Sequence, residues 1–401
     1  MPGWAIMIDE RPLRILVGAD VPPNPDSGAA GTVFQMNQAL RGLGHEVHEI
    51  WAADLGRRIK HGNLHYILEL PFAYRREIRK MMRRNEYDVV ELNQPHAWLA
   101  AADFRRSGCP GVFVNRSHGH EVRFSELESS WRPIQKRSPG ITQRLCSDLV
   151  RRRIAFHWNR VIKHSDGIIV SCDQDAGFLE TRYGLRRDRI AVINQGVPDE
   201  YLERPVKPMT PERMRNIIYA GNFVACKGPF ILAECIVELL TANPELRFSW
   251  VCDARDHAKA LELIDSKVRH QIRMIDWMPQ SQLIRLYDEH GLLLFPSFFE
   301  GFGKVPLEAM SRGLCVIAND LGGMSDYIKH GTNGFLTQPG DRSAIIEYAT
   351  KLLGSSELAS RVGREATKTA FRYSWARSAE HAVRFYRDCA VQKLARIRGK
   401  G

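Results

Sequence analysis

Long hydrophobic runs are absent from this sequence of 401 residues. No apolar segment approaches the roughly 20 residues that a membrane-spanning helix requires, and the apolar stretch near the N-terminus is too short for a signal peptide. The eight cysteines are scattered and form no CxxC pair, which argues against a zinc site and against a disulfide framework. We therefore expect a cytoplasmic protein whose thiols are reduced.

Metal-ligand clusters and nucleic-acid-binding modules are missing as well. His61 and His65 have the i, i+4 spacing of ligands on one helix face, but no further ligands accompany them, so surface histidines are the better interpretation. The net charge of +11 suits anionic partners without identifying them. Because basic and aromatic residues do not interleave on a recognised module, nucleic acid is not an expected partner.

What the sequence does contain is an alternation of short strands and helices. Apolar content of 44% and charged content of 26% are ordinary for a soluble globular chain. Apolar segments such as "LRILVGAD" and "YDVVELNQ" end at turn residues and alternate with helical segments such as "VFQMNQALRGLG", as in parallel sheets with crossover helices. Around 203–213 the proline-rich segment "ERPVKPMTPER" predicts a linker, after which the pattern restarts. The sequence thus predicts an α/β protein with two Rossmann-like units in tandem.

The stretch 295–320, "FPSFFEGFGKVPLEAMSRGLCVIAND", places two glutamates eight positions apart around a glycine-rich turn. Strands are expected on both sides, and the proline and glycine that bound 306–312 suit the start and end of a short helix. The turn "EGFGK" then leads into a helix N-terminus, where unpaired N–H groups and the helix dipole favour an anion. Since a carboxylate would repel a phosphate, Glu300 and Glu308 should accept hydrogen bonds from sugar and ribose hydroxyls. The simpler alternative is a strand–loop–helix connection with solvated acids.

Three further loops are expected at the carboxyl ends of strands, where ligands of open α/β sheets bind. They are "DSGAAG", "RSHGHE" with His118, and "AGNFVACKG" with Lys227. Alone, each has an ordinary explanation: a glycine-rich turn, a structural histidine and a solvated lysine. Together with 295–320, and in this order along the chain, they predict one ligand site.

These motifs resemble those of the family 4 glycosyltransferases, retaining enzymes that use nucleotide-diphospho-sugars. The resemblance runs nearly end to end and includes the glycine loop at 27–30, His118, Lys227 before a glycine, and the two glutamates with seven residues between them. The "GG" at 322–323 and the "NGF" at 333–335 also fit. The resemblance implies the GT-B fold, in which two Rossmann-like domains face each other across a deep cleft. The implied acceptor-binding domain comprises residues 1–203, and a return helix at about 374–401 packs on it. The implied nucleotide-sugar-binding domain comprises residues 204–373.

The resemblance also assigns roles to individual residues. Glu300 would hold hydroxyls of the donor sugar and Glu308 the ribose, while Lys227 would neutralise the diphosphate. A fixed cation and a helix N-terminus suit a reaction in which negative charge builds up on a departing phosphate. The expected catalytic residues are His118, Lys227 and Glu300, and the expected donor-binding residues are Gly28, Ala29, Asn222, Lys227, Glu300, Gly301, Phe302, Gly303, Lys304, Val305 and Glu308. A UDP-sugar is the donor that family frequency suggests, and neither a cofactor nor a metal ion is expected.

Three positions depart from the usual pattern of the family. Asn222 stands where a phosphate-binding arginine is usual, and Lys304 is the candidate to compensate for the missing cation. Ala29 replaces a glycine, and Asp326 replaces a glutamate. A DxD in "SCDQDAG", typical of the metal-dependent GT-A fold, is better interpreted as acids that cap the next helix.

The acceptor is left open as a sugar, a lipid-linked molecule or a small molecule. The segment 132–163 carries nine lysines and arginines against one acid, Asp148. One interpretation is a peripheral contact with an anionic membrane, on its inner face. The favoured alternative is a crossover helix whose apolar face, formed by Val150, Ile154, Trp158 and Val161, packs on the sheet.

Other functions on the same scaffold are a nucleotide-sugar epimerase, a phosphorylase and a non-catalytic binding protein. No environment for a pyridoxal-phosphate lysine is recognisable, and an epimerase usually carries differently placed acids. Asn222 makes a non-catalytic relative conceivable. The intact residues that favour catalysis are His118, Lys227, Glu300 and Glu308.

Overall fold

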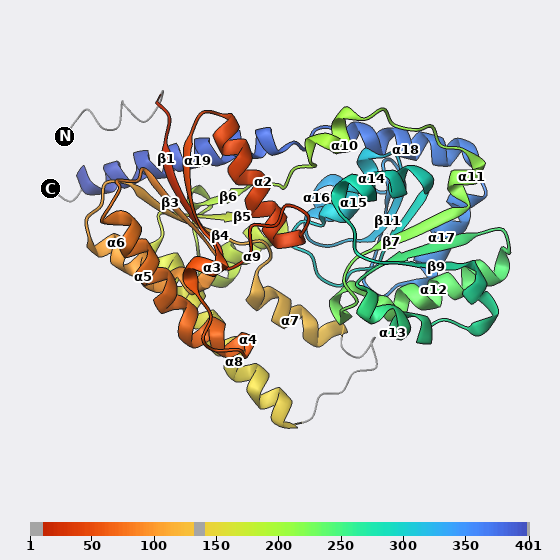
Figure 1. Cartoon of the computed structure of the whole chain (residues 1–401), viewed down its shortest axis with the longest axis horizontal. Helices are drawn as coiled ribbons and strands as arrows, with labels where there is room; N and C mark the ends of the chain where they lie inside the picture. The colour runs from red at the N-terminus through yellow and green to blue at the C-terminus, as the bar shows by residue number, and fades with distance from the viewer. Residues whose placement is uncertain (1–10, 132–140, 399–401) are drawn as a thin grey trace. The chain divides into compact units, whose positions relative to one another are not determined.

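The computed structural model describes residues 11–131 and 141–398, without the side chains of 141–145 (Figure 1). Its described part forms two compact units. The first comprises the chain up to Ser125, continues from 141 to Gln195, and ends with the segment that begins at Trp375. The second runs from Gly196 to Ser374 and also holds the chain from Glu126 to Trp131.

Each unit is built on a parallel sheet of six strands. The order in the first unit is β2-β1-β3-β4-β5-β6, and in the second it is β12-β11-β10-β7-β8-β9. The strands of the first sheet are β1 (Arg14–Gly18), β2 (Glu46–Ile50), β3 (Val89–Asn93), β4 (Val112–Arg116), β5 (Gly167–Val170) and β6 (Ile190–Val192). Those of the second are β7 (Asn216–Ala220), β8 (Arg247–Val251), β9 (Ile272–Ile275), β10 (Leu292–Phe295), β11 (Cys315–Asn319) and β12 (Phe335–Thr337). The prediction of two Rossmann-like units is confirmed.

Helices connect the strands because parallel neighbours require crossovers. The first unit contains α2 (Gly28–Gly42), α3 (Ala52–Leu55), α4 (Gly62–Leu64), the π-helix η1 (His65–Glu69), α5 (Leu70–Met82), η2 (Pro95–Ala97), α6 (Trp98–Arg106), α8 (Ile141–His164), α9 (Asp173–Tyr183), η3 (Arg187–Arg189) and α19 (Trp375–Arg398). Helix α7 (Glu121–Trp131) begins in this unit. The second unit contains α10 (Asp199–Glu203), α11 (Pro211–Met214), η4 (Ala225–Lys227), α12 (Pro229–Ala242), η5 (Ala254–Asp256), α13 (His257–Glu262), η6 (Ser266–Gln271), α14 (Gln280–Glu289), α15 (Lys304–Ser311), α16 (Gly323–Tyr327), α17 (Arg342–Leu353) and α18 (Ser356–Ala370). None of these described helices combines the length and low polarity needed to cross a bilayer.

The last helix, α19, returns to the first unit, as predicted. It packs against α2 and β4, and its apolar side chains join those of β1 and α2 in one core cluster. A buried polar triad fixes it there: the Tyr386 hydroxyl donates to Glu91 over 2.6 Å, and the Arg116 guanidinium donates two hydrogen bonds to the same carboxylate at 2.7 and 3.0 Å. Because a buried charge is tolerated only when it is paired, these three residues specify where α19 docks.

Two helix boundaries differ from the predictions. Helix α2 begins at Gly28, although the glycine-rich segment up to Thr32 had the composition of a loop. Helix α15 covers Lys304–Ser311, so it starts two residues before Pro306, because Gly303 already provides the left-handed turn from which the helix departs. Both changes bring predicted ligand-binding residues into a first helical turn.

The DxD segment was interpreted partly wrongly. Asp173 and Asp175 do open α9, but neither side chain caps it, since Cys172 is the N-cap residue. Asp175 is instead buried and pairs with the Arg123 guanidinium at 2.9 Å. The predicted packing of α8 is correct in its second half, where Trp158 and Val161 are fully buried.

Candidate functional site

The turn between β10 and α15 forms an open helix N-terminus in the second unit. Gly303, at φ +84°, is the N-cap residue, and the carbonyl oxygen of Gly303 accepts a hydrogen bond of 2.6 Å from the Tyr327 hydroxyl. The first-turn N–H groups of Lys304 and Val305 have no partner inside the helix, and Pro306 contributes none. Such a terminus attracts an anion.

The glycine pair at the start of α16 shapes this turn. A Cβ atom on Gly322 would lie 2.3 Å from the carbonyl oxygen of Glu300, and one on Gly323 would lie 2.4 Å from the Phe302 ring. The Gly323 N–H donates a hydrogen bond of 3.1 Å to the carbonyl oxygen of Gly301. Only glycines therefore allow the two loops to lie against each other. In the sequence this glycine pair was noted only through the family resemblance. In the structure the pair holds the glutamate turn in place.

Lys227 and Glu300, 73 residues apart in sequence, form an ion pair. Lys227 ends η4, and the next residue, Gly228, has φ +69° and lies so near Pro296 that a Cβ would come within 2.2 Å of its carbonyl oxygen. The Phe298 N–H completes this loop contact by donating to the carbonyl oxygen of Cys226 over 2.6 Å. Lys227 and Glu300 are 22% and 11% exposed, so the pair is accessible to a ligand without being fully solvated.

Glu308 lies one turn into α15 and is 2% exposed. Burial raises the pKa of its carboxyl, and the charge of Lys304 offsets part of that rise. Burial likewise lowers the pKa of Lys304, and Glu308 offsets part of that fall. Lys304 therefore has Glu308 as its electrostatic partner, whereas Asn222 is exposed at the end of β7.

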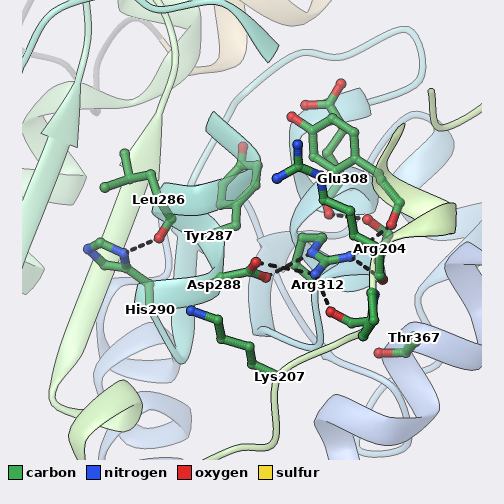
Figure 2. A network of polar contacts seen from close by, with 12 residues as sticks. Arg204, Lys207, Leu286, Tyr287, Asp288, His290, Glu308, Arg312 and Thr367 are labelled. Atoms are coloured by element: carbon green, nitrogen blue, oxygen red, sulfur yellow. Dashed lines mark hydrogen bonds and ion pairs between the residues drawn. The ribbon is translucent and has the colours of Figure 1, made fainter. Parts of the chain in front are cut away.

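The far end of α15 is held by a buried arginine that directly follows it (Figure 2). Arg312 is fully buried and pairs with Asp288 at 2.8 Å. It also donates to the carbonyl oxygens of Tyr201, Arg204 and Pro205 at 2.8–2.9 Å. The proline-rich segment predicted as a linker is thereby attached to α15 and α14. This network orients the helix whose N-terminus forms the site.

His118 follows β4 in the first unit and is positioned by Asn93 at the end of β3. Its Nε2 atom lies 2.6 Å from Asn93 Oδ1, while Asn93 Nδ2 donates to the carbonyl oxygen of Gly18 over 3.1 Å. Because the amide nitrogen donates to Gly18, the amide oxygen faces the imidazole, so Nε2 is the ring nitrogen that donates to Asn93. Both residues line a very small cavity of about 10 Å³ beside α2. No sequence pattern pointed to Asn93.

Gly28 and Ala29 occupy the first turn of α2, are exposed, and follow Ser27, whose side chain makes no capping hydrogen bond. Their N–H groups thus have no partner inside the helix. These two residues and His118 belong to the first unit. The second unit brings together the loops that carry the other predicted residues, with Lys227 against Glu300 and Glu308 below the turn.

Two family models match this chain in succession. The model described as Glycosyltransferase Family 4 matches residues 27–201, and that described as Glycosyl transferases group 1 matches residues 203–369. Together they cover most of the chain. The chain belongs to the family 4 glycosyltransferases.

Relatives of this glycosyltransferase include D-inositol 3-phosphate glycosyltransferases. That of Corynebacterium efficiens is 25% identical over 325 residues, which are 76% of this chain and 72% of the relative. That of Corynebacterium urealyticum is also 25% identical, but the alignment covers 57% of this chain and 58% of the relative, which is less than two thirds of its length.

Solved structures establish the fold. Sucrose-phosphate synthase from Thermosynechococcus elongatus superposes with a TM-score of 0.73 at 18% identity, covering 96% of this chain and 100% of that one. The HepE protein of Anabaena, solved with UDP and glucose, gives a TM-score of 0.65 at 16% identity and covers 92% of this chain and 97% of that one. At these identities the likeness concerns the fold alone. The family assignment makes the protein a glycosyltransferase that uses a nucleotide-sugar donor.

Proposed function

We propose that this glycosyltransferase transfers a hexosyl group from a UDP-sugar to an acceptor hydroxyl with retention of configuration and without a metal ion. The observation that carries the proposal is the Lys227–Glu300 pair beside the open N-terminus of α15, with Glu308 buried one turn below. This arrangement offers positive charge and carboxylate acceptors within one short stretch of structure.

The positive groups would act on the leaving group. When the bond between the anomeric carbon and the diphosphate breaks, negative charge grows on the phosphate oxygen. Lys227 and the N–H groups at the start of α15 would stabilise that charge without a metal, because they are already in place before the reaction. In the ligand-free protein, Lys227 is neutralised by Glu300. The donor therefore has to bind to the intact ion pair or separate its two side chains.

The carboxylates would orient the donor. Glu300 would accept hydrogen bonds from sugar hydroxyls, and Glu308 from the ribose. Gly301, Phe302 and Gly303 would bring the backbone close to the sugar and diphosphate. None of these groups is assigned to attack the anomeric carbon, so transfer would occur on the face from which the diphosphate departs, and the departing oxygen would accept the acceptor's proton.

The first unit would bind the acceptor. His118, whose tautomer Asn93 sets, would lie near the transferred sugar, and Gly28 and Ala29 would direct N–H groups at the phosphates. The acceptor itself is a sugar, a lipid-linked molecule or a small molecule. D-inositol 3-phosphate, which the relatives' names specify, belongs in a first acceptor panel. We propose a cytoplasmic site of action.

The alternative is a non-catalytic relative, and Asn222 in place of the usual arginine is the observation that favours it. A donor panel separates the two. Purified protein would be incubated with UDP-, GDP- and ADP-sugars, with and without EDTA, and release of nucleoside diphosphate would be measured. We expect turnover of a UDP-sugar that EDTA does not abolish, and proton NMR of the first product should show the donor's anomeric configuration. Donor binding without turnover in any acceptor mixture would favour the alternative, and an inverted product would contradict the mechanism.

A further inference from the structure

Large apolar side chains are exposed on one part of the first unit. The described residues expose twelve of them, and six lie on α4, η1, α5 and α8. These six, here called the apolar face, are Leu64, Tyr66, Leu68, Phe72, Leu149 and Phe156. Contiguous exposed apolar surface is uncommon on proteins that have no partner there.

The helical run from α4 to α5 carries four of these six residues. Leu64, Leu68 and Phe72 are spaced by four residues, so they lie along one side, and they are 47%, 53% and 61% exposed. Tyr74 and Ile78 on the same run are buried in the core. The run therefore already has a packed side, and the three exposed residues form a second apolar stripe that the fold does not use.

Helix α8, labelled in Figure 1, packs against η1 and carries the other two residues of the apolar face. Ring contacts connect the two. Tyr66 stacks on His96 with centroids 5.4 Å apart, and His96 meets His157 of α8 edge to face at 5.2 Å. Leu149 and Phe156, two turns apart on α8, are 63% and 37% exposed.

Positive charge borders the apolar face. Arg151, Arg152 and Arg153 are exposed on α8 between Leu149 and Phe156. The Arg160 guanidinium lies 5.2 Å from the centre of the Phe156 ring. The exposed residues Arg57, Arg58 and Lys60 lie shortly before α4 in the chain. The one acid on α8, Asp148, is already paired with Arg151 at 2.9 Å.

We propose that the apolar face docks on an anionic lipid surface, with the leucine and phenylalanine side chains among the acyl chains and the arginines at the phosphates. An apolar stripe bordered by cations is the pattern that adsorbs to acidic membranes. A second copy of the chain on this face would bring the same cations together and be repelled. Nucleic acid would use the arginines but leave the leucines in water. The proposal does not rest on the donor site.

The test is co-sedimentation of the full chain with vesicles of phosphatidylcholine, alone or mixed with phosphatidylglycerol. We expect binding to the mixed vesicles that weakens with salt. Leu68→Ser and Phe72→Ser should each weaken it by up to about tenfold, the effect of exposing one large apolar side chain. Arg152→Gln should weaken it about fivefold and flatten the salt dependence.

Val391→Ser is the matched control, because Val391 on α19 is 60% exposed and lies outside the apolar face. It should bind like the unmodified protein, and thermal melting should show that all four variants are folded. The proposal is wrong if mixed vesicles are not bound, or if the control loses as much binding as Phe72→Ser. Sedimentation velocity can also contradict the proposal. If the unmodified protein is a dimer that Phe72→Ser dissociates, and vesicles are not bound, the apolar face is a self-association surface.

Discussion

Replacing Lys227 by alanine should lower turnover by two to three orders of magnitude. The structure sets this scale in two ways. The lysine is one of the preorganised positive groups assigned to the leaving diphosphate, and losing one such group costs about 3–4 kcal/mol of transition-state stabilisation. In addition, its removal leaves Glu300, 11% exposed, with an unbalanced carboxylate beside the same diphosphate.

A double-mutant cycle separates these two effects. Glu300→Gln alone should reduce kcat moderately, because an amide still forms hydrogen bonds with sugar hydroxyls. In the Lys227→Ala background the same change also removes a repulsion, so it should cost less, or even restore activity, with a coupling energy of at least about 1 kcal/mol.

The assay is release of nucleoside diphosphate at saturating donor, measured for the four proteins of the cycle. Lys259→Ala is the control, because Lys259 forms an exposed pair with Asp256 at 2.8 Å and has no role in the proposed site. Additive effects of the two substitutions, or near-normal turnover of a folded Lys227→Ala variant, would refute the reasoning.

Three further predictions concern pH, packing and charge. Burial raises the pKa of Glu121, which accepts a hydrogen bond from Trp158, to about 7. The folded protein therefore holds this proton longer than the unfolded chain, so stability should fall as pH rises from about 4.5 to about 7. Between pH 5 and 8, the free energy of unfolding of Glu121→Gln should rise by about 1–2 kcal/mol relative to that of the unmodified protein. Thermal melts that show no such rise would refute the raised pKa of Glu121. Gly322→Ala should destabilise the protein by about 1–3 kcal/mol and weaken donor binding, as urea titration and calorimetry would show; a neutral substitution would contradict the contact with the glutamate turn. If Lys304 compensates for Asn222, then Asn222→Arg should partly restore the turnover of Lys304→Ala, and no rescue would exclude compensation.

The order of elements was predictable from sequence because buried parallel strands leave short apolar segments bounded by turn residues. The segment that leads into α15 could be located for the same reason, since a strand, a glycine turn and a helix-starting proline follow in order. The start of α2 could not, because a first turn of glycine and alanine has no apolar periodicity. Local pattern therefore predicts elements well and their first turns poorly.

Contacts between distant residues are what the sequence could not supply. Nothing in the sequence connected Asn93 with His118, or Arg312 with the carbonyl oxygens of 201–205. Asp175 was misinterpreted because its partner, Arg123, lies 52 residues away. The stripe of Leu64, Leu68 and Phe72 has ordinary helical spacing, and only the structure shows that the core uses the other side of that run.

The central claim is that the β10–α15 turn and Lys227 form the donor site. A crystal structure of the protein with bound nucleoside diphosphate tests it most directly. The account predicts the ribose hydroxyls within hydrogen-bond distance of Glu308 and the diphosphate at the N-terminus of α15, next to the Lys227 ammonium. A nucleotide bound elsewhere, or bound with neither Lys227 nor Glu308 in contact, would contradict it.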